Sequence, residues 1–179
     1  MCEESKRRVL PEWHRIEVTE DTIDSWVMET PYMKGVLSRG EYVKATEFGR
    51  LWALCRYGGV YMDEDVEALK PLDSLLADPF FIGYEDQITL NGAVIGSIPF
   101  GKCITFVGSN FPLACDGTLK ATIYGPQYLT AMLDRRDECK RYPPEYFYPI
   151  HYNGSGAITE NSYTNHHWAG SWKGQGNGS

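Results

Sequence analysis

The clearest periodic pattern in the chain is helical and covers residues 41–57. Apolar side chains recur there at spacings of three and four, which places them on one helix face: Ala45, Phe48, Leu51, Trp52 and Cys55. Gly58 follows at the position where a left-handed residue commonly ends a helix. Residues 60–62 then form a short apolar run that is typical of a buried strand. The sequence therefore predicts a helix, a glycine pair and a strand in direct succession.

Three further segments have the composition of strands. They are residues 15–18, residues 80–86 with the sequence FFIGYED, and residues 93–98 with the sequence AVIGSI. The pair Asn91-Gly92, just before the last of these, is a turn signal.

Two helical segments are expected outside the strongest pattern. A turn with a short helix is predicted over residues 67–76. A longer helix is predicted over residues 125–142, because Gly125-Pro126 opens it and Pro143-Pro144 follows it. The remaining C-terminal residues are aromatic and are expected to form loops. Helices that alternate with short buried strands predict a layered α/β fold.

Length and composition indicate one folded domain. The chain has 179 residues, of which 42% are hydrophobic and 13% aromatic, enough for a sizeable core. We expect the domain to cover residues 1–173, with a flexible Gly-rich tail at 174–179. The net charge of −7 disfavours nucleic acid as a partner. No apolar run approaches the roughly 18 residues of a transmembrane segment, and the charged start predicts no signal peptide.

The cysteines are expected to be free thiols. They are scattered, odd in number and include no C-x-x-C pair: Cys2, Cys55, Cys103, Cys115 and Cys139. Scattered free thiols are typical of a reducing compartment. We therefore expect a cytoplasmic protein, which could also bind peripherally at the inner face of a membrane.

Three successive carboxylates follow the predicted strand at residues 60–62. Ligands of open α/β sheets bind beyond the carboxyl ends of the strands, which is where these residues lie. If the extended geometry continues for one step, Asp63 and Asp65 point to one side and Glu64 to the other. Two converging carboxylates are hard oxygen ligands that suit Mg²⁺ or Mn²⁺. The simpler alternative is a solvated acidic turn, because the chain has 24 acidic residues.

The region around these carboxylates resembles glycosyltransferase family 32. That family includes capsular polysaccharide transferases, relatives of yeast initiating mannosyltransferases and the clostridial glucosylating toxins. Its pattern is a helix with an acid and an arginine, a Gly-Gly pair, a short apolar strand, Asp-x-Asp and a Lys-Pro-Leu turn. The matching positions are Thr46-Glu47 with Arg50, Tyr57-Gly58-Gly59, Val60-Tyr61-Met62, Asp63 with Asp65, and Lys70-Pro71-Leu72. The segment HHWAGSW at 166–172 resembles the family's ending, His-x-x-x-x-Ser-Trp.

The resemblance implies a GT-A-like fold, with a mixed central sheet flanked by helices. It implies a retaining transferase that moves a hexose from a UDP- or GDP-linked donor to a glycan or lipid-linked saccharide, in capsular or surface polysaccharide synthesis. Asp63 and Asp65 would be the catalytic pair that holds Mn²⁺ or Mg²⁺ against the donor diphosphate. His166 would complete the metal site. An exposed polar loop is the simpler interpretation of His166 and His167.

The same resemblance implies which residues bind the donor. Glu47 and Arg50, on one helix face, correspond to residues that bind hydroxyls of the donor sugar, and Tyr61 belongs to the same set. Ser171 and Trp172 would donate hydrogen bonds to phosphate oxygens. The alternative for Glu47 and Arg50 is a surface ion pair worth about 0.5 kcal/mol.

The chain departs from the family pattern in two places. The family usually has Asp where this chain has Glu47, and one extra methylene moves the carboxylate by about 1.5 Å. The family's usual first apolar strand is lacking before residues 2–18. Its absence would leave a neighbouring strand edge exposed and would favour pairing with a second copy of the chain.

Two other functions stay open. A truncated or degenerate transferase domain would bind sugar or a partner without turnover, which Glu47 and the missing strand support. A phosphohydrolase of the haloacid dehalogenase type also uses an Asp-x-Asp strand. That class predicts Thr or Ser soon after the second Asp, where this chain has Val66-Glu67.

Overall fold

The computed structural model describes residues 1–114 and 125–170. The described elements occur in the order α1 (Cys2–Val9), α2 (Ser25–Met28), α3 (Pro31–Ser38), α4 (Tyr42–Tyr57), β1 (Gly59–Met62), β2 (Val66–Ala68), η1 (Asp73–Ala77), β3 (Phe80–Tyr84), β4 (Leu90–Ser97), α5 (Lys102–Ala114), α6 (Pro126–Leu133), β5 (Lys140–Tyr142), α7 (Pro144–Phe147) and β6 (Thr164–His166).

The centre of the structure is a four-stranded mixed sheet in the order β1-β4-β3-β5. β4 pairs antiparallel with β1 and with β3, whereas β5 runs parallel to β3. A second sheet consists of β2 and β6, which pair antiparallel although they lie far apart in the chain. The predicted α/β class, with a mixed sheet, is confirmed.

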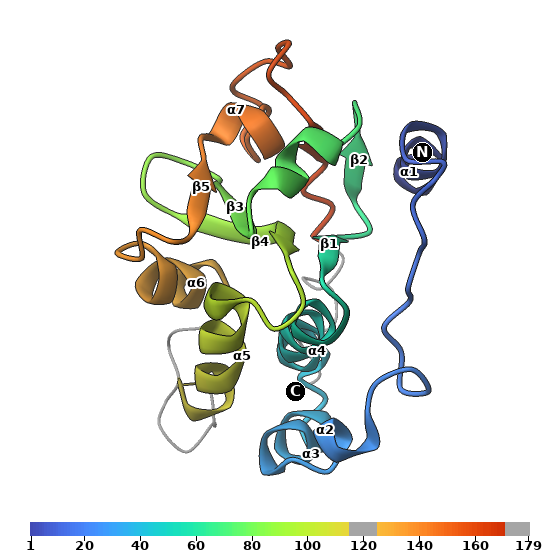
Figure 1. Ribbon diagram of the computed structural model, residues 1–179, viewed down its shortest axis with the longest axis vertical. Coiled ribbons are helices and arrows are strands. Elements are labelled where there is room, and N and C mark those ends of the chain that lie inside the picture. The colour runs from blue at the N-terminus through green and yellow to red at the C-terminus, as the bar shows by residue number, and fades with distance from the viewer. Residues whose placement is uncertain (115–124, 171–179) are drawn as a thin grey trace.

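Hydrophobic cores lie on both faces of the central sheet. Phe80 and Ile82 of β3 belong to the core that contains α4, α5 and α6, whereas Phe81 between them belongs to the core on the α7 side. This alternation follows from the two-residue period of a strand. Figure 1 shows α4, α5 and α6 below the sheet and α7 above it. Helices therefore flank the sheet as expected.

The predicted helix–glycine–strand unit is confirmed. α4 ends at Tyr57, and Gly58 and Gly59 have φ values of +68° and +87°. A Cβ atom on Gly58 would lie 2.6 Å from the Pro99 ring, so both the space and the backbone conformation require glycine. The glycine pair turns the chain from the core helix directly into β1.

The expected strand at residues 15–18 is wrong. These residues are extended but pair with no strand among the described residues. Two of them, Ile16 and Val18, line a cavity of about 140 Å³ together with residues of α4 and β1. β1 is thus at the edge of the sheet, with β4 as its hydrogen-bonded neighbour in the described structure.

The expected turn at Asn91-Gly92 is also wrong, because both residues lie inside β4. The connection between β3 and β4 comes earlier. The Asp86 carboxylate accepts hydrogen bonds from the backbone N–H groups of Ile88 and Thr89, at 2.8 and 2.7 Å. This local capping turns the chain before the Asn-Gly pair is reached.

The expected helix over 125–142 is too long. α6 ends at Leu133, and the Arg141 side chain donates hydrogen bonds to the carbonyls of Leu133 and Arg136 at 2.9 and 2.8 Å. Residues 140–142 then form β5 beside β3. The C-terminal residues, which were expected to form only loops, contain α7 and β6. The short helix expected within residues 67–76 is found as η1.

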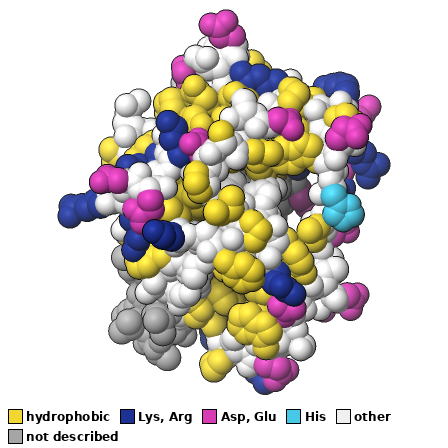
Figure 2. All heavy atoms as spheres, in the orientation of Figure 1, with side chains coloured by type: hydrophobic (Ala, Val, Ile, Leu, Met, Phe, Trp, Pro, Cys, Tyr) yellow, Lys and Arg dark blue, Asp and Glu magenta, His cyan; other side chains and the backbone are white. Residues whose placement is uncertain are grey.

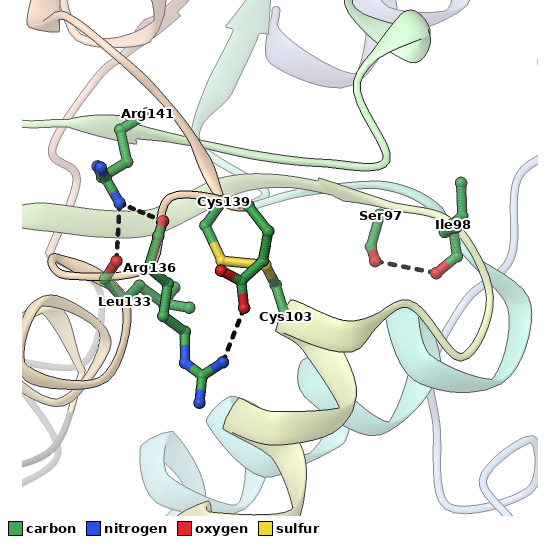
Figure 3. The surroundings of a disulfide bond; sticks show 8 residues. Ser97, Ile98, Cys103, Leu133, Arg136, Cys139 and Arg141 are labelled. Carbon is green, nitrogen blue, oxygen red and sulfur yellow. Dashed lines mark hydrogen bonds and ion pairs between the residues drawn. A yellow bond between two sulfur atoms is a disulfide. The ribbon is translucent and has the colours of Figure 1, made fainter.

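A disulfide contradicts the expectation of free thiols. Cys103, at the start of α5, is bonded to Cys139, just before β5, and both residues are buried (Figure 3). Among the described cysteines, Cys2 and Cys55 are free. The bond ties α5 to the sheet and removes the cysteine-based reason for a reducing compartment. The predicted cytoplasmic location stays a prediction that no described residue tests.

No described helix is both long enough and apolar enough to cross a membrane.

A cavity of about 550 Å³ opens between α2, α4 and α5, lined by side chains such as Trp26, Trp52 and Phe100. Figure 2 shows apolar side chains gathered on the lower part of this face. None of the predicted site residues lines that cavity.

Candidate active site

The aspartates lie in the short turn that connects β1 to β2. The Asp63 N–H still donates to the Ala93 carbonyl at 2.9 Å, so Asp63 extends the β1–β4 ladder by one residue. Val66 N–H donates back to the Asp63 carbonyl at 3.1 Å, which closes a tight turn. The predicted position of the carboxylates, where the strand leaves the sheet, is found in the structure.

The structure brings three predicted metal ligands together. Ligand atoms of Asp63, Asp65 and His166 all lie within 4.8 Å of one another. The His166 Nε2 atom is 3.1 Å from Oδ1 of Asp65. β6 delivers the histidine, because His166 is the Cα partner of Val66 in the β2–β6 register.

Backbone N–H groups of residues 167–169, just after β6, also donate hydrogen bonds to Asp65. The Ala169 N–H donates to Oδ2 of Asp65 at 2.9 Å, and the His167 N–H donates to the Asp65 carbonyl at 3.0 Å. The His167 ring turns to the other side and lies 2.9 Å from a carboxylate oxygen of Glu67. His166 therefore faces the aspartate pair and His167 does not, as the sequence indicated.

Asp63 has different partners from Asp65. Its Oδ1 atom accepts a hydrogen bond from the Tyr61 hydroxyl at 2.7 Å and lies 3.5 Å from Nη1 of Arg50. The Arg50 guanidinium stacks over the Tyr61 ring, 4.7 Å from its centroid. Tyr61 and Arg50, both predicted donor-binding residues, thus orient Asp63 and compensate part of its charge.

The predicted pair on α4 is largely buried beside this group. Arg50 Nη1 donates to the Gly92 carbonyl at 2.9 Å and only 14% of its side chain is exposed. Burial raises the pKa of Glu47, and the Arg50 charge and the Gly125 N–H partly oppose that shift. The alternative of a solvent-exposed ion pair is therefore wrong. A buried carboxylate and guanidinium are a costly arrangement that structural stability alone does not require.

Buried polar atoms without partners gather at this site. Among the described residues, Oε2 of Glu47, Nε of Arg50, Nδ1 of His166 and Oδ1 of Asn165 are buried and lack a hydrogen bond. Such atoms are rare in folded proteins and each costs about 1–3 kcal/mol unless a ligand satisfies it. Three of the four belong to predicted site residues.

The donor set fits a hard divalent cation. Two carboxylates and one imidazole leave room for water and diphosphate oxygens in an octahedral shell, which is how Mg²⁺ and Mn²⁺ are commonly held. No described cysteine belongs to this set of metal ligands. The residues present therefore match the cation that the sequence predicted.

Sequence reasoning missed Tyr148 and Asn91. The Tyr148 hydroxyl donates to the Asn91 carbonyl at 2.9 Å and accepts from the Val94 N–H at 3.1 Å. Asn91 in turn donates to the Glu85 carboxylate. This buried network holds β4 beneath the site. No spacing in the sequence signals it, although a tyrosine in the run of aromatic residues 146–148 is a candidate for such a role.

Ser171 and Trp172 lie outside the described residues, as do the residues of the expected tail. Trp168, in the same motif, is described: its Nε1–H donates to the Ile150 carbonyl at 2.8 Å and its φ is +53°. A tryptophan with positive φ is unusual and is held by these surroundings.

The chain is similar to several known proteins. Residues 3–82 match the family described as "glycosyltransferase sugar-binding region containing DXD motif". An uncharacterised protein of Arabidopsis thaliana is 35% identical over 117 residues, which are 59% of this chain and 18% of the relative. The lactosylceramide 4-alpha-galactosyltransferase of Rattus norvegicus is 29% identical over 152 residues, which are 75% of this chain and 39% of that protein. The chain spans less than half the length of these curated relatives.

Among solved structures, the PaToxG glycosyltransferase is similar, with a TM-score of 0.42 and 20% identity over 61% of this chain and 41% of that one. The chain is therefore similar to DXD-containing glycosyltransferases, through the family match over residues 3–82 and through the rat relative.

Proposed function

We propose that the chain is a retaining glycosyltransferase that moves a hexose from a UDP- or GDP-linked donor to a glycan or lipid-linked saccharide, in capsular or surface polysaccharide synthesis. The observation that carries the proposal is the convergence of Asp63, Asp65 and His166 within 4.8 Å, beyond the end of a strand. Retention, the sugar nucleotide and the biosynthetic role come from the family resemblance.

The three ligands would hold Mn²⁺ or Mg²⁺. When bound, such a cation supplies Lewis-acid stabilisation of the negative charge on a departing diphosphate. Asp65 is fixed by His166 and by the Ala169 N–H, so its carboxylate is already oriented. Asp63 is fixed by Tyr61. Side chains held in this way lose little further entropy when the donor binds.

Glu47 and Arg50 would bind the hydroxyls of the donor sugar. A carboxylate oxygen accepts hydrogen bonds and a guanidinium N–H donates them, and each residue has one buried polar atom without a partner. Their burial keeps water away from the sugar, where water would compete as an acceptor. The rat relative is by its name a galactosyltransferase, so a galactose donor is the first to test.

The experiment is a thermal-shift panel of UDP- and GDP-sugars, each with Mn²⁺, with Mg²⁺ and with a chelator. We expect the melting temperature to rise for one nucleotide in the presence of the cation only. The shift grows with ligand concentration as RT ln(1 + [L]/Kd), so millimolar affinities are detectable. A melting temperature that no nucleotide changes would contradict the proposal.

The alternative is a domain that binds the donor without turnover. It is favoured by Glu47, whose longer side chain replaces the family's usual aspartate. Release of the nucleoside diphosphate from the donor in the presence of a saccharide acceptor, measured by chromatography, separates the two functions. The family match favours either of them over the phosphohydrolase.

A further inference from the structure

A group of aromatic rings extends from the metal ligands to the surface. The Trp168 ring lies 4.2 Å from the His166 ring, centroid to centroid, and 6.1 Å from the Tyr152 ring. The His151 ring lies 4.1 Å from the Tyr152 ring, tilted by 47°, and 5.6 Å from the Trp168 ring. The rings therefore connect the candidate cation site to a surface position.

Tyr152 is unusually exposed for a ring in such a group. Its exposed fraction is 71%, whereas the half-buried Trp168 supports it from within. One side of the Tyr152 ring is in contact with His151. The remaining ring surface is in solvent, beside a site that already contains buried polar atoms without partners.

The loop that carries Tyr152 is fixed by hydrogen bonds. His151 N–H donates to the Ser155 carbonyl and Gly154 N–H donates to the His151 carbonyl, both at 2.8 Å. Ile150 and Gly156 form a β-bridge at the base of the loop. Gly156 has φ of +99°, and a Cβ atom there would lie 2.0 Å from a backbone carbonyl. The exposed ring is thus presented by a rigid turn.

A carboxylate on the segment that follows β3 interacts electrostatically with two histidines of this group. Glu85, at the end of β3, is half-buried, accepts a hydrogen bond from Asn91 and interacts electrostatically with His151 and His166. Burial raises the pKa of its carboxyl, and the Asn91 hydrogen bond partly opposes this. Its second oxygen makes no hydrogen bond to any residue that the structure describes. Glu85 therefore has an acceptor to offer to a ligand.

The placement separates this surface from the donor-binding residues. Glu47, Arg50 and Tyr61 approach the site from α4 and β1, on the Asp63 side. Tyr152 and Trp168 approach it from the Asp65 and His166 side. A transferase needs one region for the donor sugar and another for the acceptor, and the aromatic surface lies beside the candidate cation site on a different side from the donor-binding residues.

We propose that Tyr152, supported by His151 and Trp168, is the stacking platform for a pyranose ring of the acceptor, and that Glu85 accepts hydrogen bonds from hydroxyls of that ring. The apolar face of a pyranose, with its C–H groups, packs well on an aromatic ring, while its edge requires polar partners. The net charge of −7 favours a neutral sugar over an anionic one. This proposal rests on the proposed function, because it names the acceptor side of the same site.

Binding of three probes tests the proposal: the methyl glycosides of α-glucose, β-galactose and α-mannose. Saturation-transfer NMR is recorded with the full chain, UDP or GDP, and Mn²⁺. We expect signal from at least one glycoside, with C–H protons of one ring face most strongly saturated. Tyr152→Ala should weaken its binding about tenfold and Tyr152→Phe should preserve it. Tyr42→Ala is the control, because Tyr42 is also an exposed tyrosine, at 60%, but lies at the start of α4.

A separate variant tests the proposed hydrogen bonds between Glu85 and the sugar hydroxyls. Glu85→Gln should weaken glycoside binding severalfold when nucleotide and cation are present at saturating concentrations. A glycoside signal that is absent from the wild type, or unchanged in Tyr152→Ala, would overturn the platform while the thermal shift is intact. Loss of every nucleotide response in the wild type overturns the proposed function instead, so the two failures are distinguishable.

Discussion

The imidazole of His166 lies 3.1 Å from the carboxylate of Asp65, although 101 positions separate the two residues in the chain. The pairing of β2 with β6 brings them together, since Val66 next to Asp65 is opposite His166. The Asp-x-Asp turn therefore gains its third ligand from the last described strand.

Removal of one carboxylate tests the cation site. Asp65→Ala should abolish the Mn²⁺-dependent thermal shift with nucleotide, because it removes a ligand and leaves His166 without its partner. Glu64→Ala is the matched control, since Glu64 is the exposed carboxylate of the same triplet. Isothermal titration with Mn²⁺ and UDP or GDP measures both. Equal affinities in the two variants would exclude Asp65 as a ligand.

Glu47 determines a pH dependence of stability. Its raised pKa means that the folded chain binds this proton more tightly than the unfolded chain does. The free energy of unfolding should therefore fall as the pH rises from the ordinary glutamate pKa through the raised one. Glu47→Gln should remove that dependence and raise the melting temperature at pH 7 by about 2–4 °C. Thermal unfolding from pH 4 to 8 measures both effects.

Glu41 provides a control, because its pKa is shifted in the opposite direction from that of Glu47. The Arg39 hydrogen bond lowers the pKa of Glu41, and Lys44 adds to this. Glu41→Gln should consequently lower stability at pH 7, by a small amount because the group is near the surface. If both glutamine variants shift the melting temperature in the same direction, the assigned environments are incorrect.

Arg50 links α4 to the site, and its loss should be costly. Arg50→Met leaves the Asp63 and Glu47 carboxylates without their nearest cation, which in buried pairs costs about 3–5 kcal/mol. Arg56→Met, at an arginine with 52% of its side chain exposed, should change stability by less than about 1 kcal/mol. Urea unfolding followed by fluorescence compares the two. A destabilisation of equal size would mean that Arg50 is not held as described.

The Cys103–Cys139 disulfide predicts a dependence on reducing agent. Thiol titration in denaturant should find two more reactive thiols after reduction than before it. For a separation of 36 residues, loss of the bond should cost about 3–4 kcal/mol. Serine at both positions should reproduce that loss without reductant, whereas Cys55→Ser, at a free cysteine, should not. An unreduced sample with every cysteine reactive would show that the bond does not form.

Local patterns predicted α4, the glycine pair, β1 and the Asp-x-Asp turn correctly. There the periodicity, the helix end and the strand follow one another within a few residues, so local preferences are sufficient. The prediction of a turn at Asn91-Gly92 failed because the chain already turns before this pair, where the Asp86 carboxylate caps the turn. The Asn-Gly pair prefers a turn, but the pairing of β4 with its neighbouring strands outweighs that local preference.

The features of the structure that the sequence does not predict depend on contacts between residues far apart in the chain. The β2–β6 sheet, the disulfide and the Tyr148 contact with Asn91 join segments separated by 36 to 101 positions. The histidine could be suggested only through the family resemblance, since no spacing relates His166 to Asp65. Burial of Arg50 likewise depends on its contact with Gly92 of β4, and Glu47 lies against Gly125, just before α6.

The pairing of β2 with β6 has a consequence for synthesis of the protein. A ribosome makes the two aspartates early, but the strand that carries the histidine leaves the exit tunnel last among the described elements. Nascent chains that have not yet reached β6 thus lack His166, and the three candidate metal ligands come together only once that strand has been made. Shortened translation products that end before residue 164 would be inert, however well their helices formed.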